Sequence, residues 1–143
     1  MENPSIMDND NKYGITEVPS VDTCKKAKTK YWGEITTLFD QDGFTVKRIW
    51  MNAHTQSSLE YHVKKKESYY IESGCLKVGL RIGRGKNTSV TLNQGDVFHI
   101  PPGLMHMRIA MLDTVIIEVS TTDDDSDSHI VEDGKTYKFV EDN

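Results

Sequence analysis

The stretch SSLEYHVKKKESYYIESG (residues 57–74) decides the fold and gives the first indication of chemistry. Side chains two positions apart on an extended strand point to the same face. One face therefore carries the polar side chains Ser58, Glu60, His62 and Lys64. The other face carries the apolar side chains Leu59, Tyr61 and Val63. Glu67 opens the next strand, and because buried ionisable groups need partners, this arrangement predicts a functional site inside the protein.

A second stretch, GDVFHIPPGLMH (residues 95–106), contains a rigid turn at Pro101, Pro102 and Gly103. Such a turn ends one strand and can direct His106, on the next strand, towards the polar face of the first stretch. Imidazole and carboxylate groups are ordinary ligands of zinc, manganese, iron and cobalt. The sequence therefore predicts one divalent ion of these elements, held by Glu60, His62, Glu67 and His106.

Short segments of β-branched, aromatic or alternating residues fill the middle of the chain, with Gly, Pro, Asn or Asp at many of the breaks. We predict eight strands, at residues 44–51, 57–63, 67–73, 75–82, 88–92, 96–100, 106–112 and 114–120. No segment shows helical periodicity over the length of a helix. The pattern predicts an all-β sandwich, barrel or jelly roll. This single domain covers residues 29–143 and follows a polar, flexible N-terminal arm, residues 1–28.

The composition excludes several classes of protein. The chain has 143 residues, enough for one domain, and its formal net charge of −5 disfavours non-specific binding of nucleic acid. No run approaches the roughly 20 apolar residues of a membrane span, and the N-terminus lacks the layout of a secretory signal. Two cysteines, Cys24 and Cys75, make no disulfide framework, so we expect a cytoplasmic protein.

The run TTDDDSDSH (residues 121–129) carries four aspartates and no apolar residue, which is the composition of a solvated loop. Calcium binding is the alternative, but the spacing fits no calcium loop that we can name. We therefore expect much of the negative charge to lie outside the site. The net charge therefore does not exclude an anionic ligand.

The two stretches together resemble the paired motifs of the cupin superfamily. The first family motif runs from a Gly through His-x-His and a Glu to a second Gly, and the second runs from a Gly through Pro-x-Gly and a His to an Asn. Seven positions agree in register, namely His62, Glu67, Gly74, Gly95, Pro101, Gly103 and His106. Three positions depart, namely His54, Glu60 and Ala110. The resemblance implies the cupin double-stranded β-helix, a jelly-roll barrel.

A narrower resemblance covers about residues 30–133. The chain is similar to the cupin domain of type II mannose-6-phosphate isomerases at YWGEI (31–35), FTVKRI (44–49), SSLEYH (57–62), ESYYIESG (67–74), IPPGLMH (100–106) and VIIEVS (115–120). The ligand set of that family is typically Gln, His, Glu and His, so a residue other than histidine is expected at Glu60. The resemblance implies a metal-dependent isomerase of a sugar or sugar phosphate in carbohydrate metabolism.

Isomerisation of an aldose to a ketose needs an electrophile at the carbonyl and a base that carries a proton between neighbouring carbons. A phosphosugar also needs a cationic site for its phosphate. The candidate bases are Glu60, provided that it does not bind the ion tightly, and Tyr69, although Tyr69 also suits the floor of the pocket. Two arginines of the family are replaced here by Lys65 and Met107. The predicted substrate-binding residues are Ser58, Lys64, Lys65 and Arg108.

Other interpretations stay open at this point. The missing family arginines favour a non-catalytic cupin that binds carbohydrate or metal. An iron-dependent oxygenase is less favoured, although His and carboxylate ligands can leave positions open for dioxygen. Taken singly, each candidate histidine is more often a core or exposed residue than a ligand. Cupins resembling this chain are often dimers, and the apolar face of Leu59, Tyr61 and Val63 suits the interface of a homodimer.

Overall fold

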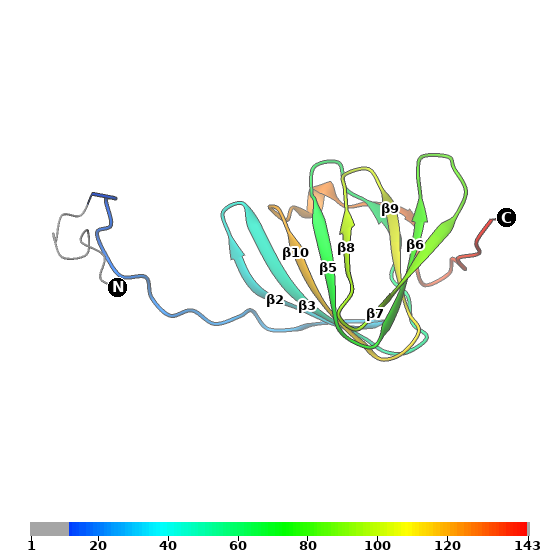
Figure 1. Ribbon diagram of the computed structural model, residues 1–143, viewed down its shortest axis with the longest axis horizontal. Helices are drawn as coiled ribbons and strands as arrows, with labels where there is room; N and C mark the ends of the chain where they lie inside the picture. Colours follow the sequence, from blue (N-terminus) through cyan, green and yellow to red (C-terminus); the bar gives the residue numbers. More distant parts are fainter. Residues whose placement is uncertain (1–11, 143) are drawn as a thin grey trace.

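Two antiparallel β-sheets face each other in the computed structural model, which describes residues 12–142 (Figure 1). The first sheet has the strand order β1-β2-β3-β10-β5-β8 and the second has the order β11-β4-β9-β6-β7. The first sheet consists of β1 (Lys28–Lys30), β2 (Gly33–Gln41), β3 (Phe44–Met51), β10 (Thr114–Ser120), β5 (Glu67–Ser73) and β8 (Val97–Ile100). The second consists of β11 (His129–Glu132), β4 (Leu59–Tyr61), β9 (Met105–Ala110), β6 (Cys75–Arg81) and β7 (Thr88–Asn93).

The expected all-β jelly roll is confirmed, and each of the eight predicted strands has a counterpart. The prediction for residues 57–63 was too long, because only Leu59–Tyr61 form a strand there. Three strands were not among the eight, namely β1, β2 and β11. A 3₁₀ turn, η1 (Asp125–Asp127), is the only helical element that the structure describes.

The core lies between the two sheets. Alternate side chains of the first sheet point inward, and Ile49, Ile71 and Ile116 are fully buried there. They pack with Leu76 and Val78 of the second sheet, which are also fully buried. The apolar core therefore fills one part of the interior and leaves the part beside β4 and β9 to polar groups.

A tight turn joins β5 to β6 and so links the two sheets. Gly74 occupies it with a φ of +94°, a backbone conformation that L side chains rarely adopt. A Cβ atom here would meet the carbonyl oxygen of Asp113 and the Oγ1 atom of Thr114, the latter at 2.6 Å. The motif glycine is thus required by the turn itself.

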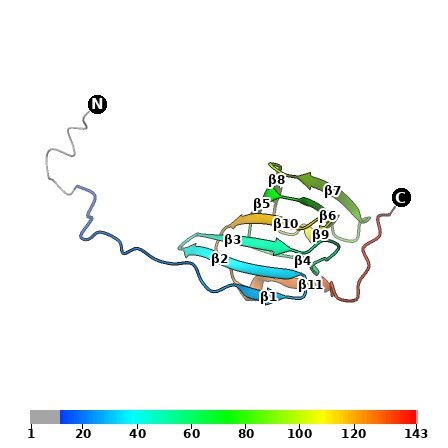
Figure 2. The same ribbon diagram turned by 90° about the horizontal axis from the view of Figure 1, so that it is seen from below.

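The two ends of the described chain differ. Residues 12–27 contain no strand, are exposed, and run away from the barrel (Figure 2). The rest of the predicted arm, residues 1–11, lies outside the described residues. By contrast, residues 133–142, which we call the C-terminal segment, lie along the barrel, where the Nε2 atom of Gln56 donates to the carbonyl oxygens of Gly134 and Tyr137.

The face expected to be apolar and open to a second copy is largely covered by the chain itself. Leu59 is completely buried, and the ring of Tyr61 stacks on the ring of His129 with 5.0 Å between centroids. Of the three predicted interface residues, only Val63 is well exposed, at 58%. The proposed use of this face for dimerisation was therefore wrong at Leu59.

Candidate metal centre and adjoining pocket

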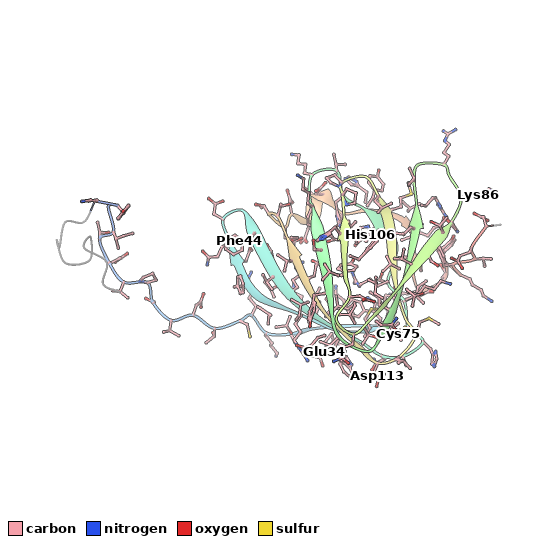
Figure 3. The ribbon with its side chains drawn as sticks, viewed as in Figure 1. Glu34, Phe44, Cys75, Lys86, His106 and Asp113 are labelled. Atoms are coloured by element: carbon pink, nitrogen blue, oxygen red, sulfur yellow. The ribbon has the colours of Figure 1, made fainter. Side chains whose placement is uncertain are left out.

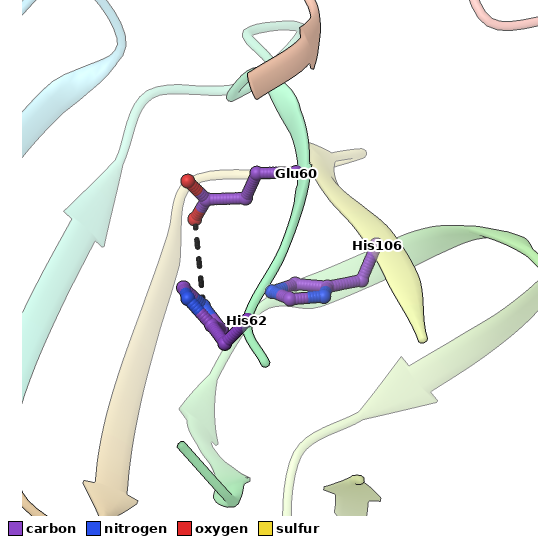
Figure 4. Close-up of side chains that lie close together, drawn as sticks. All are labelled: Glu60, His62 and His106. Carbon is purple, nitrogen blue, oxygen red and sulfur yellow. Dashed lines mark ion pairs between the residues drawn. The ribbon is translucent and has the colours of Figure 1, made fainter. Parts of the chain in front are cut away.

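Three of the four predicted metal ligands meet inside the barrel. Strand β4 pairs with β9 so that Glu60 lies directly opposite His106, and His62 follows two residues after Glu60 on the same face. One ligand atom from each of these residues lies within 4.8 Å of the others (Figure 4). Figure 3 shows His106 between the two sheets, far from labelled surface residues such as Phe44 and Lys86.

Backbone carbonyls fix the orientation of both imidazole rings. The Nδ1 atom of His62 lies 3.0 Å from the carbonyl oxygen of Asp127, and that of His106 lies 2.9 Å from the carbonyl oxygen of Leu104. A carbonyl can only accept, so each Nδ1 carries a proton and donates it. In the neutral rings the lone pair is therefore on Nε2, which is the arrangement of metal-binding histidines. Both Nε2 atoms are buried and neither has an aligned hydrogen-bond partner.

The fourth predicted ligand, Glu67, reaches the same place from the other sheet. Its Oε1 atom lies 2.8 Å from Nε2 of His106 and its Oε2 atom lies 3.8 Å from Nε2 of His62. Burial opposes ionisation of Glu67, but the contacts with His106, Lys65 and His62 outweigh it and lower the pKa of Glu67 to about 2. The carboxylate is therefore ionised, as a metal ligand must be.

The donor set fits a divalent ion. Ligands about 2.1 Å from an ion in tetrahedral or octahedral geometry lie roughly 3–4 Å apart, close to the separations seen here. Oxygen and imidazole donors in this combination suit zinc, manganese, iron or cobalt. Within residues 12–142, Glu60, His62 and His106 are also the only group of three or more candidate ligands that lie this close together. Their cluster could hold one metal ion.

The expectation of a merely solvated aspartate loop was wrong for two of its four carboxylates. Asp127 is nearly buried, and its side chain accepts hydrogen bonds from the backbone N–H groups of residues 63–65. Asp123 bridges two lysines, at 2.6 Å from Nζ of Lys47 and 3.0 Å from Nζ of Lys65. The loop therefore positions His62 and one wall of the site. The local sequence pattern does not predict these contacts.

A pocket of about 270 Å³ adjoins the metal cluster on the side of β3, β9 and β10. Three of the four predicted substrate-binding residues line it, namely Ser58, Lys65 and Arg108. The fourth, Lys64, is exposed and lines a separate hollow with Asp124 and Asp127. Glu60 belongs to both the cluster and the pocket wall, so it joins the two.

Neither Glu118 nor Lys47 is among the site residues predicted from the sequence. Register aligns Glu118 of β10 with Lys47 of β3 and with Tyr69 of β5, so the three side chains cross the sheet in one row. Glu118 and Lys47 line the pocket. The sequence pattern could have identified Glu118, because it lies two residues after Ile116 and therefore shares the inward face of that strand. Burial, reinforced by the negative charge of Glu67, raises the pKa of Glu118.

Tyr69 is completely buried beneath the pocket. Its hydroxyl donates to Oε1 of Glu67 and accepts from Nη1 of Arg108, both at 3.3 Å. Burial raises the pKa of Tyr69 well above its usual value, so the phenol stays protonated near neutral pH. A protonated phenol is a poor base, which leaves Glu60 as the better of the two candidate bases.

The fold and the site define a class before any relative is considered, namely a jelly-roll barrel with histidine and carboxylate donors converging in its interior. The family comparison gives the same answer. Residues 26–137 match the cupin family, and the chain belongs to that family.

Several solved structures share the fold at low identity. KdgF from Halomonas sp. has a TM-score of 0.62 at 16% identity, over 71% of this chain and 92% of that one. The capsular polysaccharide assembling protein CapF from Staphylococcus aureus has a TM-score of 0.67 at 16% identity, over 78% of this chain but only 33% of CapF. Oxalate decarboxylase from Bacillus subtilis has a TM-score of 0.65 at 15% identity, over 80% of this chain and 33% of that one.

These likenesses show the fold alone. No curated protein matches the chain. The narrower resemblance to type II mannose-6-phosphate isomerases is not carried by these comparisons and stays a prediction. Residues 12–142 contain no helix that is long and apolar enough to cross a membrane.

Proposed function

We propose that this cupin is a metal-dependent enzyme of carbohydrate metabolism that isomerises a small sugar or sugar phosphate. One observation carries the proposal. Two buried imidazoles, each held by a backbone carbonyl through Nδ1, direct their Nε2 atoms towards the carboxylates of Glu60 and Glu67 at the edge of a polar pocket. In a purely structural role, His106 would pair with Glu67, but the buried Nε2 atom of His62 would have no hydrogen-bond partner, at a cost in free energy.

The residues of the pocket suit this chemistry. Bound between His62 and His106, a divalent ion would supply the electrophile that polarises a substrate carbonyl. Glu60 is the candidate that moves the proton between carbons, because its side chain is 23% exposed and faces the pocket. Ser58 is a neutral hydrogen-bonding group on the same wall, of the kind that sugar hydroxyls need.

The comparisons support a carbohydrate ligand only indirectly. CapF is described as a capsular polysaccharide assembling protein, and this chain shares a fold with part of it at 16% identity. Folds of this kind host many functions, so the argument rests on the site and not on the neighbour.

Solvent exchange tests the isomerase directly. Metal-loaded protein is incubated in deuterated water with mannose 6-phosphate, fructose 6-phosphate, mannose and related aldoses, and NMR follows the hydrogens at C1 and C2. We expect deuterium to enter at one of these carbons, at a rate that falls at least tenfold in Glu60→Gln, because general-base catalysis typically contributes 10²–10⁴-fold. No incorporation into any of these sugars would end the isomerase proposal.

A non-catalytic binding protein is the second candidate. It is favoured by the pairing of Lys47 and Lys65 with Asp123, which leaves these lysines less free to hold a phosphate than the arginines of the family. This function predicts that a sugar raises the melting temperature of the metal-loaded protein without any exchange of deuterium. A melting temperature that no sugar changes would count against it.

A further inference from the structure

Arg108 differs from every other cation of the pocket. It lies on β9, two residues after His106 on the same strand, and only 8% of its surface is exposed. Its Nη1 atom donates to the hydroxyl of Tyr69, and its guanidinium carbon lies 5.2 Å from the ring centroid of Trp32. The buried Nε atom has no hydrogen-bond partner.

Two lysines of the same pocket, Lys47 and Lys65, are already paired with carboxylates. Asp123 contacts both Lys47 and Lys65, and Nζ of Lys65 also lies 3.4 Å from Oε2 of Glu67. Within the described residues, Arg108 takes part in no such ion pair, although Glu118 and Glu60 are near enough to favour its charged form. Lys30 also lines the pocket but is exposed to solvent, so Arg108 is the one buried cation among the described pocket residues whose charge has no direct counter-ion.

The nearby carboxylates stabilise the charge of Arg108, but its buried Nε–H group has lost water without gaining an acceptor, which costs free energy. Its planar group of donors matches the two oxygens of a carboxylate or phosphate, and such bidentate contacts are among the strongest in proteins. The ring of Trp32 on one side and Tyr69 on another hold the group in place, so little entropy is lost when a ligand binds.

We propose that Arg108 is the anion-binding site of the pocket, and that the natural ligand carries a single carboxylate or phosphate group beside its hydroxyls. This inference rests on the proposed function, because it names the substrate class of the same pocket. Glu60 and Arg108 line the same cavity of about 270 Å³, so one small ligand can contact both. Its anionic group then lies on Arg108 while another oxygen reaches the metal cluster.

Tryptophan fluorescence gives a readout next to the proposed site. Trp32 and Trp50 are the two tryptophans of the chain, so Trp50→Phe leaves Trp32 as the single reporter. In that background, metal-loaded protein is titrated with glucose, glucuronate, glucose 6-phosphate and inorganic phosphate. Glucuronate and glucose 6-phosphate separate the two sources of the anion, since one carries a carboxylate and the other a phosphate.

We expect one of the two anionic sugars to bind at least tenfold more tightly than glucose, the usual scale of a charge-assisted hydrogen bond. Arg108→Gln should remove that preference and leave the affinity for glucose unchanged. Arg48→Gln is the matched control, because Arg48 is half exposed and pairs with Glu72 instead of lining the pocket. If Arg108→Gln fails to fold, Arg108→Lys, which keeps the charge but loses the planar donors, should reduce the preference several-fold.

Two results would overturn the inference. One is an unmodified protein that binds glucose as tightly as both anionic sugars, and the other is an Arg108→Gln variant that keeps a full preference for the anion. The proposed function fails separately. Anion-selective binding without deuterium exchange would leave Arg108 as the anion site of a binding protein, whereas exchange into neutral aldoses without anion preference would leave the isomerase and remove the anion site.

Discussion

At the scale of single residues, the histidines decide whether a metal is held. Each Nε2 atom is buried and faces the candidate carboxylate ligands, while each Nδ1 atom is fixed by a carbonyl. We predict that His62→Ala or His106→Ala lowers the metal content of protein purified without chelator to less than about a tenth of that of the unmodified protein, since each removes one of very few ligands. Elemental analysis measures the content.

The matched control is His99→Ala. His99 lies on the other sheet, where its Nδ1 atom is 2.6 Å from Oγ of Ser68 in an exposed contact. This variant should retain the full metal content. The metal site would be refuted by unmodified protein that holds less than about a tenth of an equivalent and whose melting temperature does not respond to added zinc or manganese.

Asp123 gives the protein a specific dependence on pH. Burial alone would raise the pKa of Asp123, but its contacts with Lys47 and Lys65 outweigh burial and hold it below the usual value of 3.8. A depressed pKa stabilises the folded state above pH 3.8, and this contribution is lost as the pH falls through the lower folded-state value. Asp123→Asn should therefore cost about 1 kcal/mol at pH 7, the upper end for a partly exposed ion pair.

Melting temperatures of the two proteins from pH 7 downward check this prediction. The difference between the unmodified protein and Asp123→Asn should be constant near neutral pH and should shrink below about pH 4. A difference that stays constant to the lowest pH measured would show that the carboxylate charge is not what stabilises the fold.

At the scale of the elements, the turn between β5 and β6 has a steric requirement that can be isolated. Gly74 has a φ of +94° and a crowded Cβ position, whereas Gly43 has a φ of +93° and nothing within 4 Å of its Cβ position. Gly43→Ala should lower the free energy of unfolding by about 1–2 kcal/mol, because an alanine is strained in this left-handed conformation. Gly74→Ala should cost at least about 2 kcal/mol more, because the backbone at Asp113 and Thr114 must also move.

Urea denaturation of the two variants gives the comparison. Equal losses of stability in Gly74→Ala and Gly43→Ala would mean that the neighbouring strand yields without cost, and the steric account of the motif glycine would then be wrong.

The loop before β11 supports the metal cluster from outside. The side chain of Asp127 accepts from the backbone of residues 63–65, and its carbonyl oxygen accepts from the ring of His62. Asp127→Ala keeps that carbonyl but removes the carboxylate that fixes its position, so it should weaken metal binding by about 10-fold, the lower end of the usual effect of disturbing a group that orients a ligand. Asp125→Ala, which alters an exposed carboxylate of the same loop, should leave the affinity unchanged.

Competition with a chelating dye measures both affinities. An Asp127→Ala variant that binds zinc as tightly as the unmodified protein would show that the ring of His62 keeps its orientation without this loop.

The elements also show how far sequence reasoning reaches. Alternation within one strand placed Glu60 and His62 on a common face, because the period of a strand is independent of the rest of the fold. It did not identify β11, which has only four residues after a polar run, nor the role of Asp127, whose partners lie more than sixty positions earlier in the chain. Contacts of that range depend on how the sheets fold together, which local periodicity does not encode.

At the scale of the whole molecule, the C-terminal segment packs against the barrel and is held there by hydrogen bonds. The hydroxyl oxygen of Tyr137 accepts from Nη2 of Arg81 at 3.1 Å and from Nδ2 of Asn87 at 3.0 Å. Tyr137→Phe removes the acceptor and leaves two donors in a half-buried place, so it should cost about 1–2 kcal/mol in urea denaturation.

Tyr13→Phe is the control for this change, because Tyr13 is 82% exposed. It should leave the free energy of unfolding unchanged. A Tyr137→Phe variant as stable as the unmodified protein would show that the C-terminal segment adds nothing through this hydroxyl.

A homodimer stays a prediction. The face of Leu59 and Tyr61 is a poor candidate for the dimer interface, because Leu59 is buried and Tyr61 is covered by His129. Apolar side chains remain exposed on the outer side of the six-stranded sheet, among them Tyr70 at 44% and Val119 at 46%. Sedimentation velocity over a range of concentrations distinguishes a dimer from a monomer.

The double attachment of Asp127 has a thermodynamic consequence. One aspartate holds the ring of His62 through its carbonyl and the backbone of Lys65 through its carboxylate, while Asp123 and Asp125 of the same loop line the pocket. Any ligand that orders this loop also orders His62, a candidate metal ligand. Linkage between two binding sites is reciprocal. If a bound ion raises the affinity for the pocket ligand by some factor, the bound ligand must raise the affinity for the ion by the same factor.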